Sequence, residues 1–180
     1  TVISGPPYPN LDASIELIKL PSLDLFSHPN HVRALKWRHL RSFSDTFEWW
    51  TMLTGGFAEP YTFGRRLHKY LKTCGRHFDI IHDNQSLCYG LLNIQRLGIL
   101  VTATIDHPIT RDREEAIKNA KDAIHRLGAR RWYSFLAMQK VVAQKLHHVV
   151  SVSETSRQDI EICFERPSVQ TRVIPNGIDT

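Results

Sequence analysis

The sequence predicts an α/β fold with a doubly wound, parallel, Rossmann-like sheet. Short runs of apolar and β-branched residues, of which residues 99–105 (ILVTATI) are the clearest, alternate with longer segments of helical periodicity. Strands that are separated by helices need crossover connections, which favour parallel pairing within one sheet. The chain has 180 residues, 42% of them hydrophobic, which is sufficient for one packed core.

In the first half of the chain, prolines and glycines indicate where the predicted elements end. Pro21 stops one apolar run, and a Pro at a helix start is compatible with the fixed backbone angle of that residue. The expected elements are strands at 1–4 and 15–20, a basic helix at 30–41, a loop at Gly55-Gly56 and then a helix in which Phe63, Leu67 and Leu71 recur at helical spacing.

In the second half, strands and helices alternate regularly. Residues 99–105 are β-branched nearly throughout, as expected for a strand buried on both faces. Ser86 and Ser153 are expected N-caps, and Gly98 is an expected helix stop. The expected elements are strands at 78–84, 99–105, 147–153 and 170–178, helices at 86–98 and 154–164, and a basic helical segment at 113–146 with an apolar stripe of Phe135, Met138, Val142 and Leu146.

Charge and cysteine content favour some kinds of partner and cellular setting, but they do not identify a single partner. The formal net charge of +5 favours anionic partners, namely phosphorylated small molecules, an acidic membrane surface or nucleic acid. Cys74, Cys88 and Cys163 show no CxxC pairing, which favours reduced thiols in a cytoplasmic setting over a disulfide framework or a zinc site. We expect no metal site, no cofactor, no spanning helix and no signal peptide.

Polar residues follow four of the predicted strands. The carboxyl ends of parallel strands lie along one edge of a sheet, and open α/β sheets bind their ligands at this edge. We therefore predict a ligand site there. The four pairs are Asp83-Asn84, Asp106-His107, Ser153-Glu154 and Asn176-Gly177.

Six stretches, taken together, resemble one known family. They are TVISGPP, TGGFAEPYTFG, FDIIHDN, LGILVTATIDHPITRDR, HHVVSVSETSRQDIE and VQTRVIPNGIDT, and they are distributed nearly from one end of the chain to the other. Their order and spacing resemble the amino-terminal domain of retaining, nucleotide-sugar-dependent glycosyltransferases of family four, which have the GT-B fold. The most specific part is VVSVSETSRQDI followed by VIPNGIDT.

The resemblance implies a domain division and an activity. Residues 1–175 would form the acceptor-side domain without the family's first strand and helix. Residues 176–180, with Asn176-Gly177, would begin the hinge to an absent nucleotide-binding domain. The implied enzyme transfers a hexosyl group from a nucleotide sugar to a hydroxyl of a glycan, lipid-linked or small-molecule acceptor, and the fragment alone is expected to be inactive.

The exit of the strand at 99–105 departs from the family pattern. Members commonly end this strand in Thr-x-His, whose histidine contacts the donor sugar, whereas Asp106 stands at that place here and His107 follows. The resemblance makes both residues catalytic candidates. Asp106 would accept hydrogen bonds from sugar hydroxyls and stabilise positive charge on the sugar, and His107 would contact the acceptor. The alternative is that Asp106 caps the following turn.

Further candidate residues lie in loops near the same edge. Arg111 and Arg113 suit a phosphate on the acceptor, or else they belong to a solvated basic loop. The helix start at Ser153 and Glu154 has free amides that face the cleft and can help bind an anion. Additional acceptor contacts are expected from Gly55, Gly56, Glu59, Tyr61, Thr62 and Asn84.

A basic, aromatic stretch at 125–148 suggests peripheral attachment to anionic lipid, which suits a lipid-linked acceptor. The alternative is a helix that covers the sheet and exposes a solvated basic face. Trp49 and Trp50 are either lipid-facing or part of the core. The alternative function is a basic Rossmann-like module that binds a membrane surface or nucleic acid without catalysis. A nucleic-acid partner is not expected, since no recognition motif is present.

Overall fold

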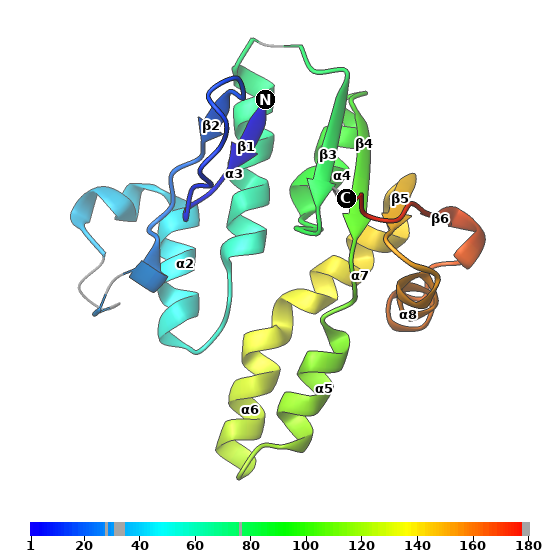
Figure 1. Cartoon of the computed structure of the whole chain (residues 1–180). Helices are drawn as coiled ribbons and strands as arrows, with labels where there is room; N and C mark the ends of the chain where they lie inside the picture. The colour runs from blue at the N-terminus through cyan, green and yellow to red at the C-terminus, as the bar shows by residue number, and fades with distance from the viewer. Residues whose placement is uncertain (28, 31–34, 76, 178–180) are drawn as a thin grey trace.

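The computed structural model describes residues 1–27, 29–30, 35–75 and 77–177. Its strands are all parallel and fall into two sheets (Figure 1), so the predicted α/β class is confirmed. No ladder joins these two sheets in the described part of the chain. One sheet pairs β1 (Val2–Ser4) with β2 (Leu17–Lys19), and the other contains β3 (Ile80–Asn84), β4 (Leu100–Ile105), β5 (His148–Ser151) and β6 (Thr171–Val173) in this order.

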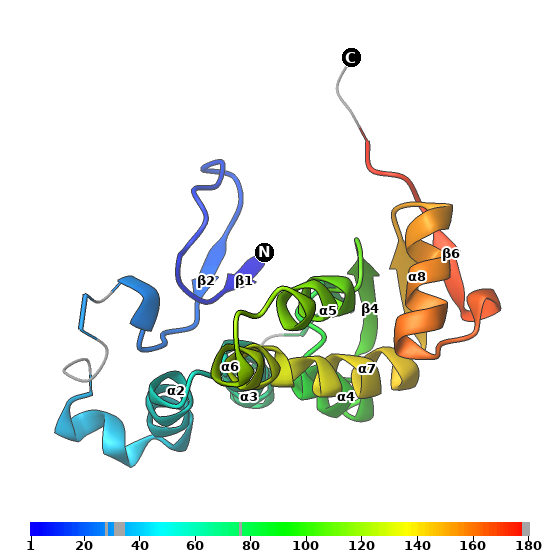
Figure 2. The same cartoon turned by 90° about the horizontal axis from the view of Figure 1, so that it is seen from below.

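The helices that connect the strands form a layer. Figure 2 shows α2, α3, α4 and α7 below the level of β4, and the packing of α3 on α4 and of α4 on α7 agrees with this view. The elements are α2 (Phe43–Leu53), α3 (Glu59–Thr73), α4 (Tyr89–Arg96), α5 (Thr110–Lys118), α6 (Ala123–Trp132), α7 (Leu136–Lys145) and α8 (Glu154–Phe164), with short 3-10 helices η1 (Leu25–Ser27), η2 (Trp37–Arg41), η3 (Tyr133–Phe135) and η4 (Ser168–Gln170).

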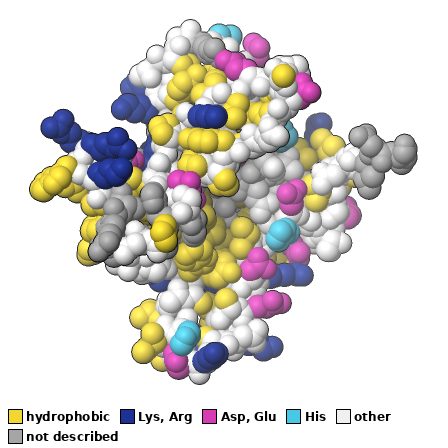
Figure 3. Space-filling view, turned by 60° about the vertical axis from the view of Figure 1, so that its left-hand side comes forward, with side chains coloured by type: hydrophobic (Ala, Val, Ile, Leu, Met, Phe, Trp, Pro, Cys, Tyr) yellow, Lys and Arg dark blue, Asp and Glu magenta, His cyan; other side chains and the backbone are white. Residues whose placement is uncertain are grey.

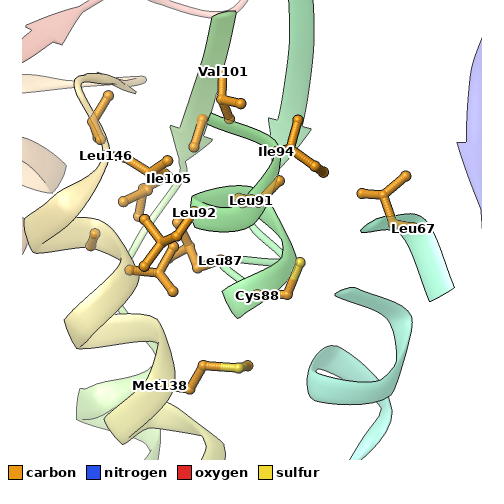
Figure 4. Close-up of a cluster of buried hydrophobic side chains, with 14 of the residues drawn as sticks. Leu67, Leu87, Cys88, Leu91, Leu92, Ile94, Val101, Ile105, Met138 and Leu146 are labelled. Atoms are coloured by element: carbon orange, nitrogen blue, oxygen red, sulfur yellow. The ribbon is translucent and has the colours of Figure 1, made fainter. Parts of the chain in front are cut away.

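The apolar core lies between the four-stranded sheet and the helices α4 and α7. Leu91 and Ile94 of α4 meet Val101 and Ile105 of β4, and all four side chains are fully or almost fully buried (Figure 4). The apolar stripe that was predicted for the later helix is confirmed in Met138, Val142 and Leu146, which are buried, while Phe135 is half-buried. Burial of such side chains is the main stabilising contribution in a fold of this kind.

Two glycines let α3 and α4 approach each other closely. A Cβ atom added at Gly90 would lie 2.2 Å from the carbonyl oxygen of Gly64, and one added at Gly64 would lie 2.7 Å from the Cys88 side chain. No side chain fits at these distances. The crossing of the two helices therefore requires glycine at both positions.

The predicted helical segment at 113–146 is wrong as a single element. It contains α5, α6, η3 and α7, and the chain reverses after residue 118 so that α5 and α6 form a hairpin (Figure 1). Asp122 provides the new helix start, because its carboxylate accepts a hydrogen bond from the backbone N–H of His125 at 2.9 Å. No residue of α6 is buried, so the hairpin projects from the domain.

Several local predictions are corrected by the structure. The strand β4 is covered fully on one face only, since Val101, Ala103 and Ile105 are buried while Thr102 and Thr104 are half-buried. The helix α2 was not predicted. Of the basic helix expected at 30–41, only η2 is seen, and residues 31–34 lie outside the described residues.

The predicted caps have different outcomes. Ser86 does not cap α4, which begins after Cys88, and the Ser86 hydroxyl instead donates to the carboxylate of Asp83. Gly98 does follow α4, with φ at +85°. Ser153 caps α8 as predicted, since its hydroxyl accepts a hydrogen bond from the backbone N–H of Ser156 at 3.1 Å.

Candidate active-site cleft

A cleft of about 320 Å³ opens where the strands β1, β2, β3 and β4 end. Its wall is largely apolar and aromatic, with Phe57, Phe63 and Phe135 around it, and Figure 3 shows hydrophobic side chains gathered in the middle of one face of the molecule. The polar groups that line it are Glu48, Glu59, Arg66, Gln85, Ser86 and Gln139. A concave, mostly apolar site with a few convergent polar groups is typical of small-ligand binding.

Glu59 is the first residue of α3 and is the cleft's unpaired acid. Its carboxylate has no hydrogen-bond or ion-pair partner among the residues that the structure describes, and the side chain is half-buried. The pKa of Glu59 is raised to about 7, mainly by burial and secondarily by the charges of Glu48 and Asp24, against the opposing charge of Arg66. Near neutral pH, this carboxyl can therefore either donate or accept a hydrogen bond.

The second acid of the cleft, Glu48, is held in an ionic network between α2 and α3. Only 3% of it is exposed, and it accepts hydrogen bonds from the hydroxyl of Thr62 and from the guanidinium of Arg66. Arg66 also pairs with Asp45, with Nη2 at 2.5 Å from Oδ1. The backbone N–H of Leu23 donates to Glu48 at 3.3 Å. The network fixes a charged pair at the wall of the cleft, as buried charges require.

Gln85 joins the exits of β3 and β4. Its side-chain oxygen accepts a hydrogen bond from the backbone N–H of Asp106 at 2.7 Å, and its side-chain nitrogen donates to the carbonyl of His107 at 2.7 Å. Gln139 of α7 donates to the carbonyls of Gln85 and Ser86 at 3.4 and 3.3 Å. These bonds fix the backbone of Asp106 and His107 beside the cleft.

The side chains of the two catalytic candidates remain available. Asp106 is half-buried and His107 is exposed, and within the described residues the Asp106 carboxylate accepts no hydrogen bond. The alternative that Asp106 caps the following turn therefore finds no support in the geometry. The turn cap lies one strand away, where the buried carboxylate of Asp83 accepts hydrogen bonds from the Ser86 hydroxyl and from the Leu87 N–H at 3.0 Å.

The predicted acceptor residues differ in their position relative to the cleft. Glu59 lines the cleft, and Asn84 ends β3 with an exposed side chain. Gly55, with φ at +74°, and Gly56 form the turn between α2 and α3, where a Cβ on Gly56 would lie 2.7 Å from the Arg131 guanidinium. Tyr61 faces away from the cleft, toward Tyr89.

The prediction for Thr62 is corrected. Its side chain has no exposed surface and donates to Glu48, so it cannot contact an acceptor directly. Thr62 lies on the inner side of α3, where a hydroxyl is retained only because it has a buried partner. It positions the Glu48 carboxylate instead.

The residues near the later strands are mostly engaged in local pairs. Arg111 of α5 pairs with Asp159 of α8 at 2.5 Å, and Glu154 pairs with Arg157 within α8. The Nε atom of Arg113 is buried and has no hydrogen-bond partner among the described residues. Asn176-Gly177 follows β6 as an exposed, irregular segment, and residues 178–180 lie outside the described residues.

The aromatic residues of the stretch 125–148 pack against the protein. The ring of Trp132 stacks on Phe57 with centroids 5.3 Å apart, and Phe135 meets the same ring edge-on at 5.3 Å. Trp49 packs beside Leu23 and Leu25, whereas Trp50 is exposed. These contacts favour the covering-helix alternative for the aromatic side chains. Of the basic residues of α6, His125, Arg126 and Arg130 are exposed, whereas Arg131 is half-buried and donates to the hydroxyl of Thr54 at 3.0 Å.

Sequence reasoning missed Glu48, Gln85 and Gln139. Glu48 belongs to an unpredicted helix, and nothing in the order of residues indicates that it meets Thr62 and Arg66. Gln85 was overlooked although it follows the polar pair Asp83-Asn84 directly, which was a usable signal. Among the residues that the structure describes, no three His, Cys, Asp or Glu side chains come together as metal ligands, and no helix is long and apolar enough to cross a membrane.

The fold and the cleft define an α/β protein with a largely apolar cleft at the carboxyl edge of parallel strands, where open α/β sheets bind their ligands. Comparison with protein families identifies it further, because the model of Glycosyltransferase Family 4 matches residues 18–180. The chain belongs to this family. It is also 42% identical over 180 residues to an MMP α-(1→4)-mannosyltransferase from Mycolicibacterium hassiacum. That match covers 99% of the chain but only 44% of the relative, so the chain spans less than half of the relative's length.

Proposed function

We propose that the chain is the acceptor-side half of a retaining glycosyltransferase that transfers a mannosyl group from a nucleotide sugar to an acceptor hydroxyl. The acceptor is a glycan, either free or lipid-linked. In this proposal, residues 1–175 supply one wall of the active site, Asn176-Gly177 begins the hinge, and a nucleotide-binding domain completes the enzyme. A cytoplasmic location, with peripheral attachment to an anionic membrane where the acceptor is lipid-linked, belongs to the same proposal.

The observation that carries the proposal is the cleft itself. Aromatic rings and an unpaired, half-buried carboxyl group are the features that a sugar acceptor needs, since its ring faces are apolar and its edges carry hydroxyls. Membership of the family supports glycosyl transfer. The name of the relative supports mannose as the transferred sugar and an α linkage as the product.

The chemistry assigns separate tasks to the groups at this edge. The bond between the anomeric carbon and the departing diphosphate breaks, a bond to the acceptor oxygen forms on the same face, and the proton of the acceptor hydroxyl passes to the departing diphosphate. Asp106 stabilises the positive charge that develops on the sugar, because a carboxylate near that carbon interacts more strongly with the transition state than with the ground state. Glu59 holds an acceptor hydroxyl in the cleft, and Gln85 positions Asp106 and His107.

Turnover by the full-length protein tests the proposal. Wild type, Asp106→Ala and Asp106→His are assayed with a panel of GDP- and UDP-sugars, with Asp112→Ala, an exposed acid of α5, as the matched control. We expect GDP-mannose or another mannosyl donor to be used. Asp106→Ala should lower kcat about 100-fold, Asp106→His should retain turnover, and Asp112→Ala should match wild type.

Two results would contradict the proposal in different ways. If both Asp106 variants match wild type, Asp106 is not a catalytic residue, although the transferase activity stands. If wild type turns over no nucleotide sugar, the alternative of a non-catalytic, basic binding module becomes the better account. Salt-dependent binding to anionic vesicles or to RNA would then be measured.

A further inference from the structure

A second cavity, of about 510 Å³, lies on the opposite face of α3 from the cleft. Glu59 and Phe63 of α3 line the cleft, whereas Tyr61, Arg65 and His68 line this second cavity together with the start of α2 and the start of α4. On a helix with 3.6 residues per turn, these two sets of positions point in nearly opposite directions. A ligand in the second cavity would therefore not occupy the cleft.

The second cavity carries positive charge without a matching acid. Arg41, Arg65, His68 and Lys69 line it, and none of its lining residues is Asp or Glu. In the described part of the chain, Arg41, Arg65 and Lys69 form no ion pair. Arg66 also reaches this cavity, but Asp45 and Glu48 already neutralise its charge. Like charges gathered in this way repel one another, and a bound anion would relieve the repulsion.

Aromatic contacts hold part of this basic wall in place. The rings of Phe43 and Phe47 stack with centroids 5.7 Å apart, Phe47 contacts Tyr61 at 5.4 Å, and Tyr61 meets Tyr89 at 6.1 Å. The guanidinium of Arg65 lies 4.7 Å from the centre of the Phe43 ring. This cation–π contact restricts the side chain before any ligand arrives, which lowers the entropic cost of binding.

We propose that the second cavity is a binding site for a phosphate group. Guanidinium groups bind phosphate through paired hydrogen bonds, and lysine adds a point charge. Arg65 and Lys69 supply these two kinds of contact from α3, Arg41 adds a second guanidinium from the segment before α2, and Asn93 adds an amide donor from α4. The phosphate belongs either to a soluble phosphorylated molecule or to a phospholipid headgroup.

Exposed apolar residues beside the cavity favour a phospholipid headgroup as the source of the phosphate. Trp37 is 88% exposed and Leu40 is 48% exposed on η2, which ends at Arg41, two residues before Phe43. Figure 3 shows Lys and Arg side chains beside hydrophobic ones at the left edge of the molecule. Such a combination is found where proteins contact anionic membranes, but a soluble phosphate needs only the cavity.

The test measures phosphate binding by the full-length protein in two arms. Inorganic phosphate is titrated calorimetrically, with a nucleoside diphosphate present at saturation so that any donor site is already occupied. Cosedimentation with phosphatidylcholine vesicles, with and without phosphatidylglycerol, forms the second arm. The variants are Arg65→Gln, Lys69→Gln and Arg65→Lys, and the control is Lys72→Gln, an exposed lysine of the same helix outside the cavity lining. Circular dichroism checks that each variant is folded.

We expect Arg65→Gln and Lys69→Gln each to weaken binding about tenfold, as the loss of one charge-assisted hydrogen bond implies. Arg65→Lys should recover part of the affinity, and Lys72→Gln should change it little. Binding of phosphate without vesicles identifies a soluble source, and binding of vesicles that depends on phosphatidylglycerol and on Arg65 identifies a headgroup. The proposal is overturned if neither ligand binds, or if Lys72→Gln weakens binding as much as Arg65→Gln does.

Discussion

The two sides of the crossing between α3 and α4 are held together by different forces. On the side of the four-stranded sheet, Leu91, Ile94 and Val142 are completely buried among other apolar side chains. On the side of the cleft, α2 and α3 are joined by the buried acid Glu48 and its partner Arg66. Apolar packing tolerates little change of shape, whereas an ion pair requires both partners. The cleft side is therefore held together by charged groups at the wall of the site, where apolar side chains would otherwise pack.

Substitution of Gly90 by Ala disrupts the crossing of α3 and α4 and should have the largest effect on stability. The new Cβ would lie 2.2 Å from the Gly64 carbonyl oxygen, so α4 must move away from α3. Overpacking against backbone should lower the free energy of unfolding by about 3 kcal/mol, as measured by urea denaturation. Gly128→Ala in α6 is the control, because nothing lies within 4 Å of its added Cβ. That control should raise stability by roughly 0.5–1 kcal/mol.

Replacement of Arg66 by Met tests the ionic side directly. The change leaves Glu48 buried without its charged partner, which should lower the free energy of unfolding by about 3 kcal/mol at neutral pH. The double variant Glu48→Gln with Arg66→Met removes the unpaired charge as well. It should therefore be more stable than Arg66→Met alone. If the double variant is less stable than the single one, the network contributes through packing rather than through charge.

The apolar side could be predicted from the sequence to a large extent. The strand at 99–105 and the stripe Met138, Val142 and Leu146 were predicted because periodicity reports which side chains are buried. The polar residues Asp106 and Ser153, which follow β4 and β5, were predicted from the points where the apolar runs stop. The hairpin of α5 and α6 was missed because both halves have helical periodicity, and the turn between them contains no proline or glycine.

The cleft side could not be predicted in the same way. Glu48 and Arg66 are 18 residues apart, and their contact depends on the angle between α2 and α3, which no local pattern encodes. Thr62 was expected to contact the acceptor, but tertiary packing buries it against Glu48. The position of Asp106 at the edge of the sheet followed from strand order, whereas the unpaired state of Glu59 required the structure.

The smallest expected effect, and the most selective one, concerns the pH dependence of stability through Glu59. Its pKa is raised from 4.5 to about 7 by burial, with the charges of Glu48 and Asp24 adding to the effect. Between these two pH values the folded protein keeps a proton that the unfolded chain releases, so the stability falls as pH rises through this window. Glu59→Gln should remove that fall and make the variant more stable than wild type above pH 7.

Urea denaturation across that window measures the effect, with Glu115→Gln, an exposed acid of α5, as the control that should leave the profile unchanged. A parallel profile for wild type and Glu59→Gln would contradict the prediction. The acceptor KM of the full-length enzyme then distinguishes two explanations for a gain in stability. If the KM rises while stability increases, the cleft retains a destabilising carboxyl because the acceptor needs it. If the KM is unchanged, Glu59 contributes to the electrostatics of the cleft wall without contacting the acceptor.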